Sequence, residues 1–488
     1  MGRSGPFFPG SDPERCGSMS GAYIMEEKKF RWPKPFSCQS KEINAMQSHR
    51  TSLQPSAYEM HTHLAHALVR YLDLSSPKDM MEYGLTSIAD LVDLISRFTT
   101  NTVALTTSSL SPIGACVSPP IALLNHSCDP NVVMVFPRTS ADPRLQEPLL
   151  HVVAIKAINS GEELLTSYID TTLPSEERRK TLEETYCFDC KCSLCMPNTR
   201  VVDPREALLC PTKKHPTKKA CDGLCQIPKE ATAQTRCSVC QKSYNAAEIV
   251  DAIAISNEGL VKSKELQYKD PERAMRLTSN LIGILTSAGL APGAHPLLAL
   301  SRLHSALLVE NLPDPNIANV ALATASSEQD CLLMNLGMST QAAIATPQQA
   351  EESKANHLTS EEKKRAEEAQ QKLDDAIRAA LRTSTGVASV LVPGHPLRGL
   401  ALAELGKLLC VDEPVPLYLG TNKQRGVYPP SGPGRLRLGK ECLIHSRSEL
   451  MVGFGGANEG GELGRQVREW LVGVEKELEA WTVGLQSV

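Results

Sequence analysis

The sequence predicts an α+β protein in which a β-rich core ends in a metal-binding cysteine segment and is followed by an all-helical domain. Short β-prone runs alternate with Gly, Pro, Asn and Asp over residues 99–168, a pattern typical of small strands joined by tight turns. Ten of the sixteen cysteines lie between Cys128 and Cys240. After about residue 246, apolar residues recur at helical spacing. These three observations set the fold class.

The 488 residues are enough for about three domains of about 150 residues each. We expect the boundaries to follow the changes in pattern: an irregular N-terminus over 1–49, the β-rich domain over 50–200, a cysteine-rich segment over 201–245 and the helical domain over 246–488.

Composition excludes several classes of protein. Lys and Arg total 51 against 55 Asp and Glu, for a net charge of −4. The chain therefore lacks the excess of basic residues that would indicate nucleic-acid binding. No run of about 18 apolar residues is present to span a membrane. The first residues lack the basic and then apolar order of a signal peptide. We therefore expect a soluble intracellular protein, cytoplasmic, nuclear or both.

The elements follow in order along the chain. Residues 1–40 are rich in Gly, Pro and Ser without a period and are expected to be irregular. Helical spacing begins near Ala57, and a second helix is predicted around residues 88–95. Runs at 132–136 and 151–155 predict strands, and residues 175–186 predict a helix.

In the helical domain, His-Pro-Leu occurs at 295–297 and again at 395–397, each time before a Leu- and Ala-rich stretch. Proline is favourable in the first turn of a helix because its missing N–H would have no partner there. The repeated opening suggests paired-helix units, similar to TPR repeats. We interpret the charged run at 348–382 as a solvated helix or linker.

The cysteines indicate metal binding. Disulfides are disfavoured inside cells, so clustered cysteines indicate a metal site or reactive thiols. Cys190, Cys192 and Cys195 can point at one centre, and tetrahedral zinc needs a fourth ligand. Nearby Cys187 and distant Cys128 are both candidates. A second set has the spacing of a zinc ribbon, and whether it binds a second zinc is left open: Cys210, Cys221, Cys237 and Cys240.

Two further motifs carry polar groups that can take part in chemistry. Residues 125–131, Asn-His-Ser-Cys-Asp-Pro-Asn, form a turn-rich segment with an amide, an imidazole and a thiol within four residues. Residues 161–170 predict a glycine turn and then a strand that carries Tyr168. Alone, such a tyrosine usually packs in a core with its hydroxyl paired nearby.

Three motifs taken together resemble the SET-domain lysine methyltransferases. They are Asn-His-Ser-Cys-x-Pro-Asn at 125–131, Gly-Glu-Glu-Leu-x-x-x-Tyr at 161–168 and Tyr-x-Phe-x-Cys-x-Cys-x-x-Cys at 186–195. Residues 98–101, Phe-Thr-Thr-Asn, and the helical tail resemble the SET- and MYND-domain (SMYD-like) branch. The tail segments 394–408 and 453–455 are similar to fungal-type members.

The resemblance implies methyl transfer from S-adenosylmethionine to a lysine of a protein substrate, histone or other. It assigns the active-site tyrosine to Tyr168 and the lysine channel to Tyr186. It assigns the binding of S-adenosylmethionine to Asn101, Asn125, His126 and Phe188. It assigns zinc to Cys128, Cys190, Cys192 and Cys195, and thus leaves Cys187 outside the site. An apolar channel fits this chemistry because desolvation favours the neutral, nucleophilic form of lysine.

The N-terminal region departs from the family pattern. A Gly-x-Gly strand is not found, and residues 1–50 offer only Cys16, Cys38 and His49 for a MYND finger. A rival interpretation is therefore a catalytically inactive, zinc-stabilised SET-like scaffold that binds other proteins through its helical domain.

Overall fold

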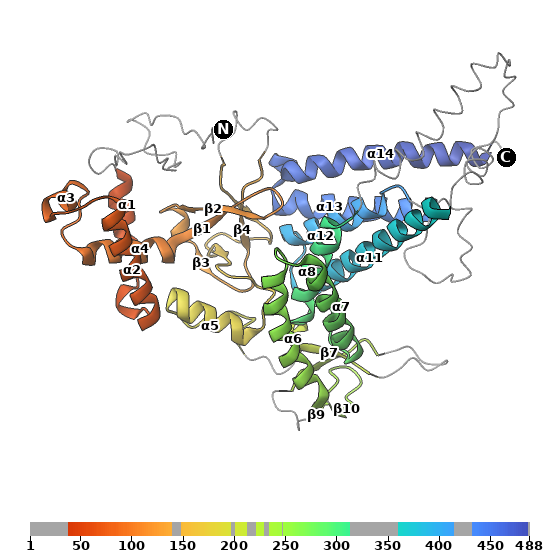
Figure 1. Ribbon diagram of the computed structural model, residues 1–488, viewed down its shortest axis with the longest axis horizontal. Coiled ribbons are helices and arrows are strands. Elements are labelled where there is room, and N and C mark those ends of the chain that lie inside the picture. Colours follow the sequence, from red (N-terminus) through yellow and green to blue (C-terminus); the bar gives the residue numbers. More distant parts are fainter. Residues whose placement is uncertain are drawn as a thin grey trace, which may run out of the picture. The chain divides into compact units, whose positions relative to one another are not determined.

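The computed structural model describes residues 38–138, 148–196, 201–211, 221–228, 234–245, 247–312, 360–413 and 432–486 (Figure 1). Of the expected irregular segment 1–40, residues 1–37 lie outside the described part. Residues 38–40 begin the helix α1 (Cys38–Ala45), so the expectation of an irregular N-terminus is wrong for that stretch. Contacts divide the chain into two compact units. Unit 1 is Met1–Pro197 together with Met451–Leu463, and unit 2 is Asn198–Leu450 together with Gly464–Val488.

Unit 1 opens with helices, two of which, α3 (Pro77–Glu82) and α4 (Ile88–Asn101), begin at a serine cap. Before them come α1 (Cys38–Ala45), the short 3-10 turn η1 (Arg50–Ser52) and α2 (Pro55–Tyr71). Ser87 caps α4, and Asp90 bonds back to the Ser87 N–H, which satisfies two N–H groups at the helix start. Ala65 of α2 packs against Leu91 and Ile95 of α4. Both helices predicted in this region are confirmed.

Three pairs of short strands form the β-rich part of unit 1. Strands β1 (Thr102–Thr106) and β2 (Pro112–Val117) are antiparallel, as are β4 (Val132–Val135) and β5 (His151–Ala154). Between them, after the 3-10 turn η2 (Ile121–Leu123), β3 (Asn125–His126) pairs in parallel with β6 (Leu165–Thr166). Helix α5 (Ser175–Tyr186) follows. The predicted strands at 132–136 and 151–155 are confirmed and pair with each other.

A segment from near the C-terminus completes unit 1. Phe454 is fully buried, and the Glu462 N–H donates to the Pro137 carbonyl at 2.9 Å. The Ser108 hydroxyl donates to the Glu462 carboxylate at 2.8 Å. Gly461 has φ +73°, and a Cβ there would lie 2.8 Å from the Pro137 oxygen. Only glycine therefore permits this close backbone approach.

Unit 2 begins with a ribbon of short strands and continues as helices (Figure 1). The 3-10 turn η3 (Pro204–Glu206) leads into β7 (Ala207–Leu209), which pairs with β8 (Leu224–Gln226), and β9 (Gln234–Arg236) pairs with β10 (Ser243–Asn245). The helices are α6 (Ala247–Leu266), α7 (Pro271–Ser287), α8 (Leu297–Glu310), α11 (Ser360–Val390), α12 (Pro396–Leu409), α13 (Pro433–Gly453) and α14 (Gly461–Gln486), with the 3-10 turn η4 (Gly456–Asn458) between the last two. From α6 to α12, each described helix packs against the next one.

Both His-Pro-Leu sequences start helices as predicted. Pro296 immediately precedes α8, and Pro396 is the first residue of α12. His395 caps α12 through its Nδ1 atom, which accepts the Leu397 N–H at 3.2 Å. The all-helical character expected after residue 246 is confirmed for the described residues.

The interpretation of the charged run 348–382 needs correction. Residues 360–382 belong to α11, and Leu373, Ala376 and Ile377 are buried in a core shared with Leu405 and Leu409 of α12. The charges conceal apolar residues three and four positions apart, which form one buried helix face. The solvated-helix interpretation is therefore wrong for residues 373–382, whereas the described residues of 360–372 are helical and mostly exposed, as expected; residues 348–359 lie outside the described part.

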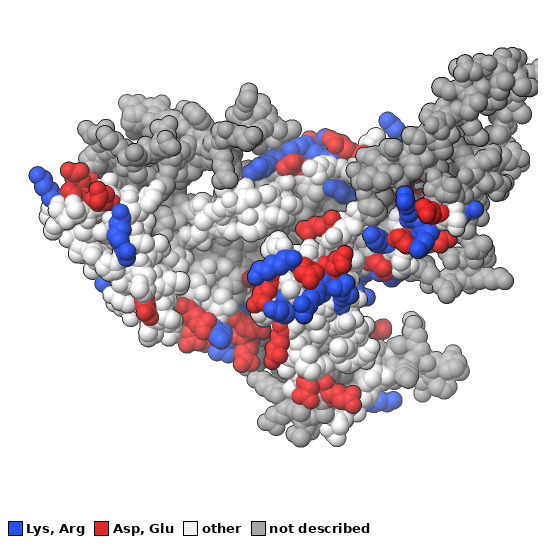
Figure 2. All heavy atoms as spheres, in the orientation of Figure 1, with Lys and Arg blue, Asp and Glu red and all other residues white. Residues whose placement is uncertain are grey.

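Acidic and basic side chains are intermixed over the described surface seen in Figure 2. This mixture agrees with the near balance of 51 basic and 55 acidic residues. Among the described helices, none is both long enough and apolar enough to cross a bilayer.

Candidate functional site: an aromatic cluster joined to a four-cysteine centre

Four cysteines of unit 1 converge from two distant stretches of chain. Cys128 follows strand β3, and the other three follow helix α5: Cys190, Cys192 and Cys195. Their sulfurs all lie within 4.8 Å of one another, and those of Cys128 and Cys195 are 3.5 Å apart. A tetrahedral zinc with bonds of about 2.3 Å holds its sulfurs about 3.8 Å apart. The cluster therefore has the donor set and the spacing to hold such an ion.

The end of helix α5 sets the course of the cysteine segment. Cys187 adopts a left-handed conformation (φ 59°) that ends the helix, and its sulfur points to the Ser52 carbonyl at 3.7 Å. The buried Arg178 donates to the Leu194 carbonyl at 3.2 Å and to the Leu173 carbonyl. Arg178 thus fixes the loop that carries Cys195 to α5, whereas Cys187 lies outside the cluster.

The thiols of this cluster differ in acidity. Hydrogen bonds from the Cys128 and Cys195 thiols hold the pKa of Cys192 well below its usual range. Burial raises the pKa of Cys190 to about 11. Here the protons of neighbouring thiols stabilise one thiolate. A cation can take the place of these protons, because metal binding displaces thiol protons.

Three rings, those of Tyr168, Tyr186 and Phe188, pack in the same core as the cysteines, and the His126 ring packs against two of them. The centroid of His126 lies 5.2 Å from that of Tyr168 and 5.9 Å from that of Phe188. Tyr168 lies 4.9 Å from Tyr186 and meets Phe188 edge-on at 6.5 Å. These tilted and edge-on geometries are favourable for aromatic pairs. The structure thus brings together the predicted residues from β3, the end of β6 and the end of α5.

His126 links the rings to the cysteines. Its Nδ1 accepts the Tyr168 N–H at 3.0 Å, so the ring proton is on Nε2, which lies 3.3 Å from the Cys128 sulfur. Burial lowers the pKa of His126 to about 4, which keeps the ring neutral at pH 7. The imidazole therefore positions Tyr168 and Cys128 at once and carries no charge.

Tyr168 places its hydroxyl in a half-buried position. The hydroxyl donates to the Leu124 carbonyl at 2.5 Å, and the Tyr186 hydroxyl donates to the Tyr168 carbonyl at 3.4 Å. Burial raises the pKa of Tyr168, and Tyr186 and Glu163 raise it further. The phenol stays protonated at neutral pH, so it can orient a polar group through its oxygen lone pairs.

Asn125 and Asn101 occupy different surroundings. The exposed Asn125 amide donates to the Glu163 carboxylate at 2.6 Å, at the start of β3. The Asn101 amide donates to the Gln47 and Arg97 carbonyls, both at 2.8 Å, and so holds the end of α4. Within the described residues, no hydrogen bond joins Asn101 to the His126 cluster, although sequence reasoning grouped them in one site.

Sequence reasoning missed the role of Asn131. Its side chain accepts the Leu165 N–H at 2.8 Å and donates to the Glu163 carbonyl at 2.8 Å. Its main chain pairs with Leu165 and with Ile155. Asn131 therefore holds β6, and through it Tyr168, in register beside β3. Its place at the end of the Asn-His-Ser-Cys-x-Pro-Asn motif was the available signal.

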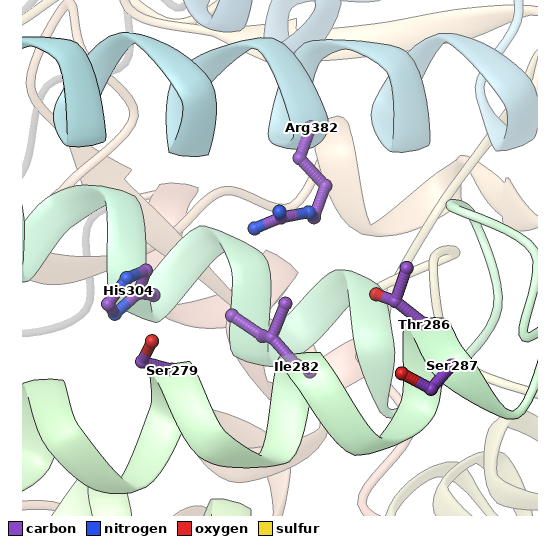
Figure 3. Close-up of a pocket in the computed structure, with 7 residues that line it drawn as sticks. Ser279, Ile282, Thr286, Ser287, His304 and Arg382 are labelled. Atoms are coloured by element: carbon purple, nitrogen blue, oxygen red, sulfur yellow. The ribbon is translucent and has the colours of Figure 1, made fainter. Parts of the chain in front are cut away.

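A separate groove lies in unit 2. It has a volume of about 350 Å³ and is lined by Ser279, Ile282, Gly283, Thr286, Ser287, His304 and Arg382. Figure 3 shows Arg382 of α11 pointing toward the facing sides of α7 and α8. These residues can contact an anionic or polar group, but among them are no stacked rings to enclose an amine. The aromatic cluster of unit 1 is therefore the better candidate for chemistry on an amine.

Comparison with known proteins agrees with this geometry. Residues 22–169 match the family model of the SET domain. Similar proteins include histone-lysine N-methyltransferase SMYD3 of Mus musculus, 35% identical over 114 residues (23% of this chain and 24% of the relative). N-lysine methyltransferase SMYD2 of Gallus gallus is 38% identical over 107 residues, 22% of each chain. The chain carries a SMYD-like SET domain.

The matching stretch spans about a quarter of the length of these relatives. N-lysine methyltransferase SMYD2-A of Xenopus laevis matches over 119 residues, 24% of this chain and 25% of its own. The SMYD-like SET domain contains the β3–β6 pair and Tyr168, whereas the α5 residues and the three later cysteines lie beyond residue 169.

Proposed function

We propose that this SMYD-like SET domain transfers a methyl group from S-adenosylmethionine to a lysine side chain of a protein. The match to the SET domain and the relatives named lysine methyltransferases support this class of reaction. The observation that carries the proposal is the ring cluster: Tyr168, Tyr186 and Phe188 share one core with the four cysteines, and His126 packs against Tyr168 and Phe188.

The sulfurs of Cys128 and the three later cysteines suit zinc, because four thiolates in a tetrahedron are typical of structural zinc. Its role here is structural. The ion would join the segment carrying Phe188 to the Asn125–His126 strand. Loss of the metal is therefore expected to separate the two sides of the ring cluster.

The residues present also fit the methyl donor. Asn125 offers an exposed amide at one end of the cluster, and Phe188, beside His126, offers a ring face for a nucleobase. When bound, S-adenosylmethionine supplies a sulfonium methyl group for in-line displacement by an amine. We assign Asn125 and Phe188 to holding it and His126 to positioning the main chain, whereas Asn101 supports the end of α4.

The half-buried Tyr168 and Tyr186 suit a lysine channel. Their rings lie 4.9 Å apart and would exclude water from an incoming side chain. Desolvation lowers the pKa of a lysine and favours the neutral amine that displacement requires. The Tyr168 oxygen would accept an N–H of that amine and fix its direction. Such positioning is worth several kcal/mol of barrier.

The helical part of unit 2 would supply the docking surface for the protein substrate. Consecutive helices α6, α7 and α8 pack as neighbours, as do α11 and α12. This order supports TPR-like paired-helix units, which use extended helical surfaces to bind proteins.

Binding of S-adenosylmethionine to the zinc-loaded chain, followed by calorimetry, tests the first step. We expect saturable binding that Asn125→Ala abolishes and that Asn159→Ala leaves unchanged, because Asn159 is exposed and bonds only locally to Glu162. Cys192→Ser should release zinc and weaken donor binding together. A folded, zinc-loaded chain that does not bind the donor would instead support the inactive scaffold.

Transfer itself is tested with labelled S-adenosylmethionine on histones and on lysine-containing peptides. Tyr168→Phe keeps the ring and removes the hydroxyl, so we expect at least about a tenfold loss of transfer with donor binding retained. Tyr268→Phe is the matched control because Tyr268 is 87% exposed. Equal transfer by both variants would remove Tyr168 from the active site.

A further inference from the structure

The second set of cysteines lies in unit 2, in the ribbon that precedes the helices. The sulfurs of Cys210 and Cys240 lie 3.6 Å apart, as do those of Cys221 and Cys237. All four lie within 4.8 Å of one another. The separation is close to the roughly 3.8 Å edge of a zinc–thiolate tetrahedron and far from a disulfide bond of about 2 Å.

Backbone N–H groups point at three of these sulfurs. The Val239 N–H donates to Cys237 at 3.4 Å. The N–H groups of Gly223 and Lys242 donate in the same way to Cys221 and Cys240. Each donor is two residues after its cysteine. Repeated at three sites, this geometry places backbone dipoles around one centre and stabilises negative sulfur there.

Two neighbouring residues, Gly223 and Tyr244, lie close to the sulfurs. A Cβ on Gly223 would lie 2.3 Å from the Cys237 sulfur, so only glycine allows the two loops to approach this closely. The Tyr244 hydroxyl lies 3.3 Å from the Cys210 sulfur and 3.8 Å from the Cys240 sulfur. A hydroxyl between two sulfurs can donate to a metal-bound thiolate and orient it.

A fifth cysteine shows that burial alone does not define the set. Cys225 is 1% exposed, and burial raises its pKa to about 12, so it is an inert thiol. It packs in the same core as Cys237 and pairs with it through a β-bridge. Its sulfur is not among the four that converge. Cys225 therefore offers a matched internal control.

The ribbon is too small to be stable by itself, since its strands have three residues each and two-stranded pairs are marginal in water. It is attached to the helices through β7. The Leu209 N–H donates to the Gly289 carbonyl at 2.8 Å, and the Ala291 N–H donates to the Ala207 carbonyl at 3.0 Å. Cys237 shares a core with Leu281 of α7.

We propose that this ribbon binds a structural zinc ion, separate from the proposed methyl-transfer centre, that fixes β7–β10 onto helices α6–α8. Its ligands are Cys210, Cys221, Cys237 and Cys240. The ion crosslinks both strand pairs at one point and so replaces the core that strands of this length cannot form.

Metal content per chain, measured by native mass spectrometry on the full-length protein loaded with zinc, tests the proposal. We expect two zinc ions in the wild type, one in Cys237→Ala and two in Cys225→Ala, although both positions are buried in one core. Cys240→Ala should lose one ion, whereas Cys240→His should retain it, because Cys3His is an accepted zinc set. Hydrogen exchange in β8 should be faster in Cys237→Ala than in Cys225→Ala.

The proposal would be overturned by a wild type that holds one ion, by loss of an ion in Cys225→Ala equal to that in Cys237→Ala, or by oxidation of the ribbon thiols to disulfides in the purified chain. Failure of methyl transfer has a different readout. Cys192→Ser removes the other ion together with donor binding, whereas Cys237→Ala should leave donor binding intact.

Discussion

Asn131→Ala is the sharpest test of how the fold positions the site. The substitution removes two side-chain hydrogen bonds of 2.8 Å, one from the Leu165 N–H and one to the Glu163 carbonyl. The half-buried Leu165 N–H loses its acceptor at a cost of about 1–2 kcal/mol. The carbonyl of exposed Glu163 can turn to water, which adds about 0.5 kcal/mol. We therefore expect β6 to be destabilised by about 2 kcal/mol.

Hydrogen-exchange mass spectrometry of residues 160–170 measures this local opening directly. A loss of about 2 kcal/mol corresponds to about thirtyfold faster exchange, since each 1.4 kcal/mol is about tenfold. Asn159→Ala is the control, because Asn159 is exposed and bonds to Glu162 within three residues. If the two variants exchange at the same rate, Asn131 does not hold β6, and the argument that it positions Tyr168 is wrong.

Three further outcomes are expected. Burial lowers the pKa of His304, as does nearby Arg382, whereas Asp375 opposes the shift, so this ring stays neutral in the folded chain. The free energy of unfolding should therefore be constant above about pH 6.5 and fall as the pH drops below it. In urea titrations, His304→Gln should remove the part of this fall that comes from His304. Gly283→Ala in α7 meets nothing within 4 Å and should stabilise unit 2 by about 0.5–1 kcal/mol, seen as a higher melting temperature; a lower one would contradict the open space. Gly461→Ala should destabilise unit 1 by about 2 kcal/mol or more, while Gly456→Ala, with a single neighbour at 3.9 Å, should change it little.

Local patterns predicted much of the fold because local physics decides them. The spacing of Cys190, Cys192 and Cys195 lets neighbouring thiols face one centre, and the His-Pro-Leu openings follow from helix capping. The order of the three SET-like motifs placed His126, Tyr168 and Phe188 in one cluster, and their rings do lie within 6.5 Å of one another.

Features that depend on distant partners could not be predicted. Asparagine is common in turns, and only the folded structure shows that the Asn131 side chain pairs with Glu163 and Leu165, 32 and 34 residues further along the chain. The buried face of α11 is set by its packing against α12. In the sequence, the charged residues at 360–372 obscure the apolar pattern of this face. Asn101 was grouped by resemblance, whereas its hydrogen bonds are local to α4 and Gln47.

The assignment of Met451–Leu463 to unit 1 has a consequence for biosynthesis. Residues 38–196 leave the ribosome well before Phe454 and before Gly461, the glycine that approaches Pro137. During that interval the core of unit 1 lacks a fully buried aromatic side chain, and its apolar surface is open to water and to chaperones. Completion of the SET-like unit is thereby tied to synthesis of the helical unit, so shortened chains that end before residue 451 are expected to be recognised as unfinished.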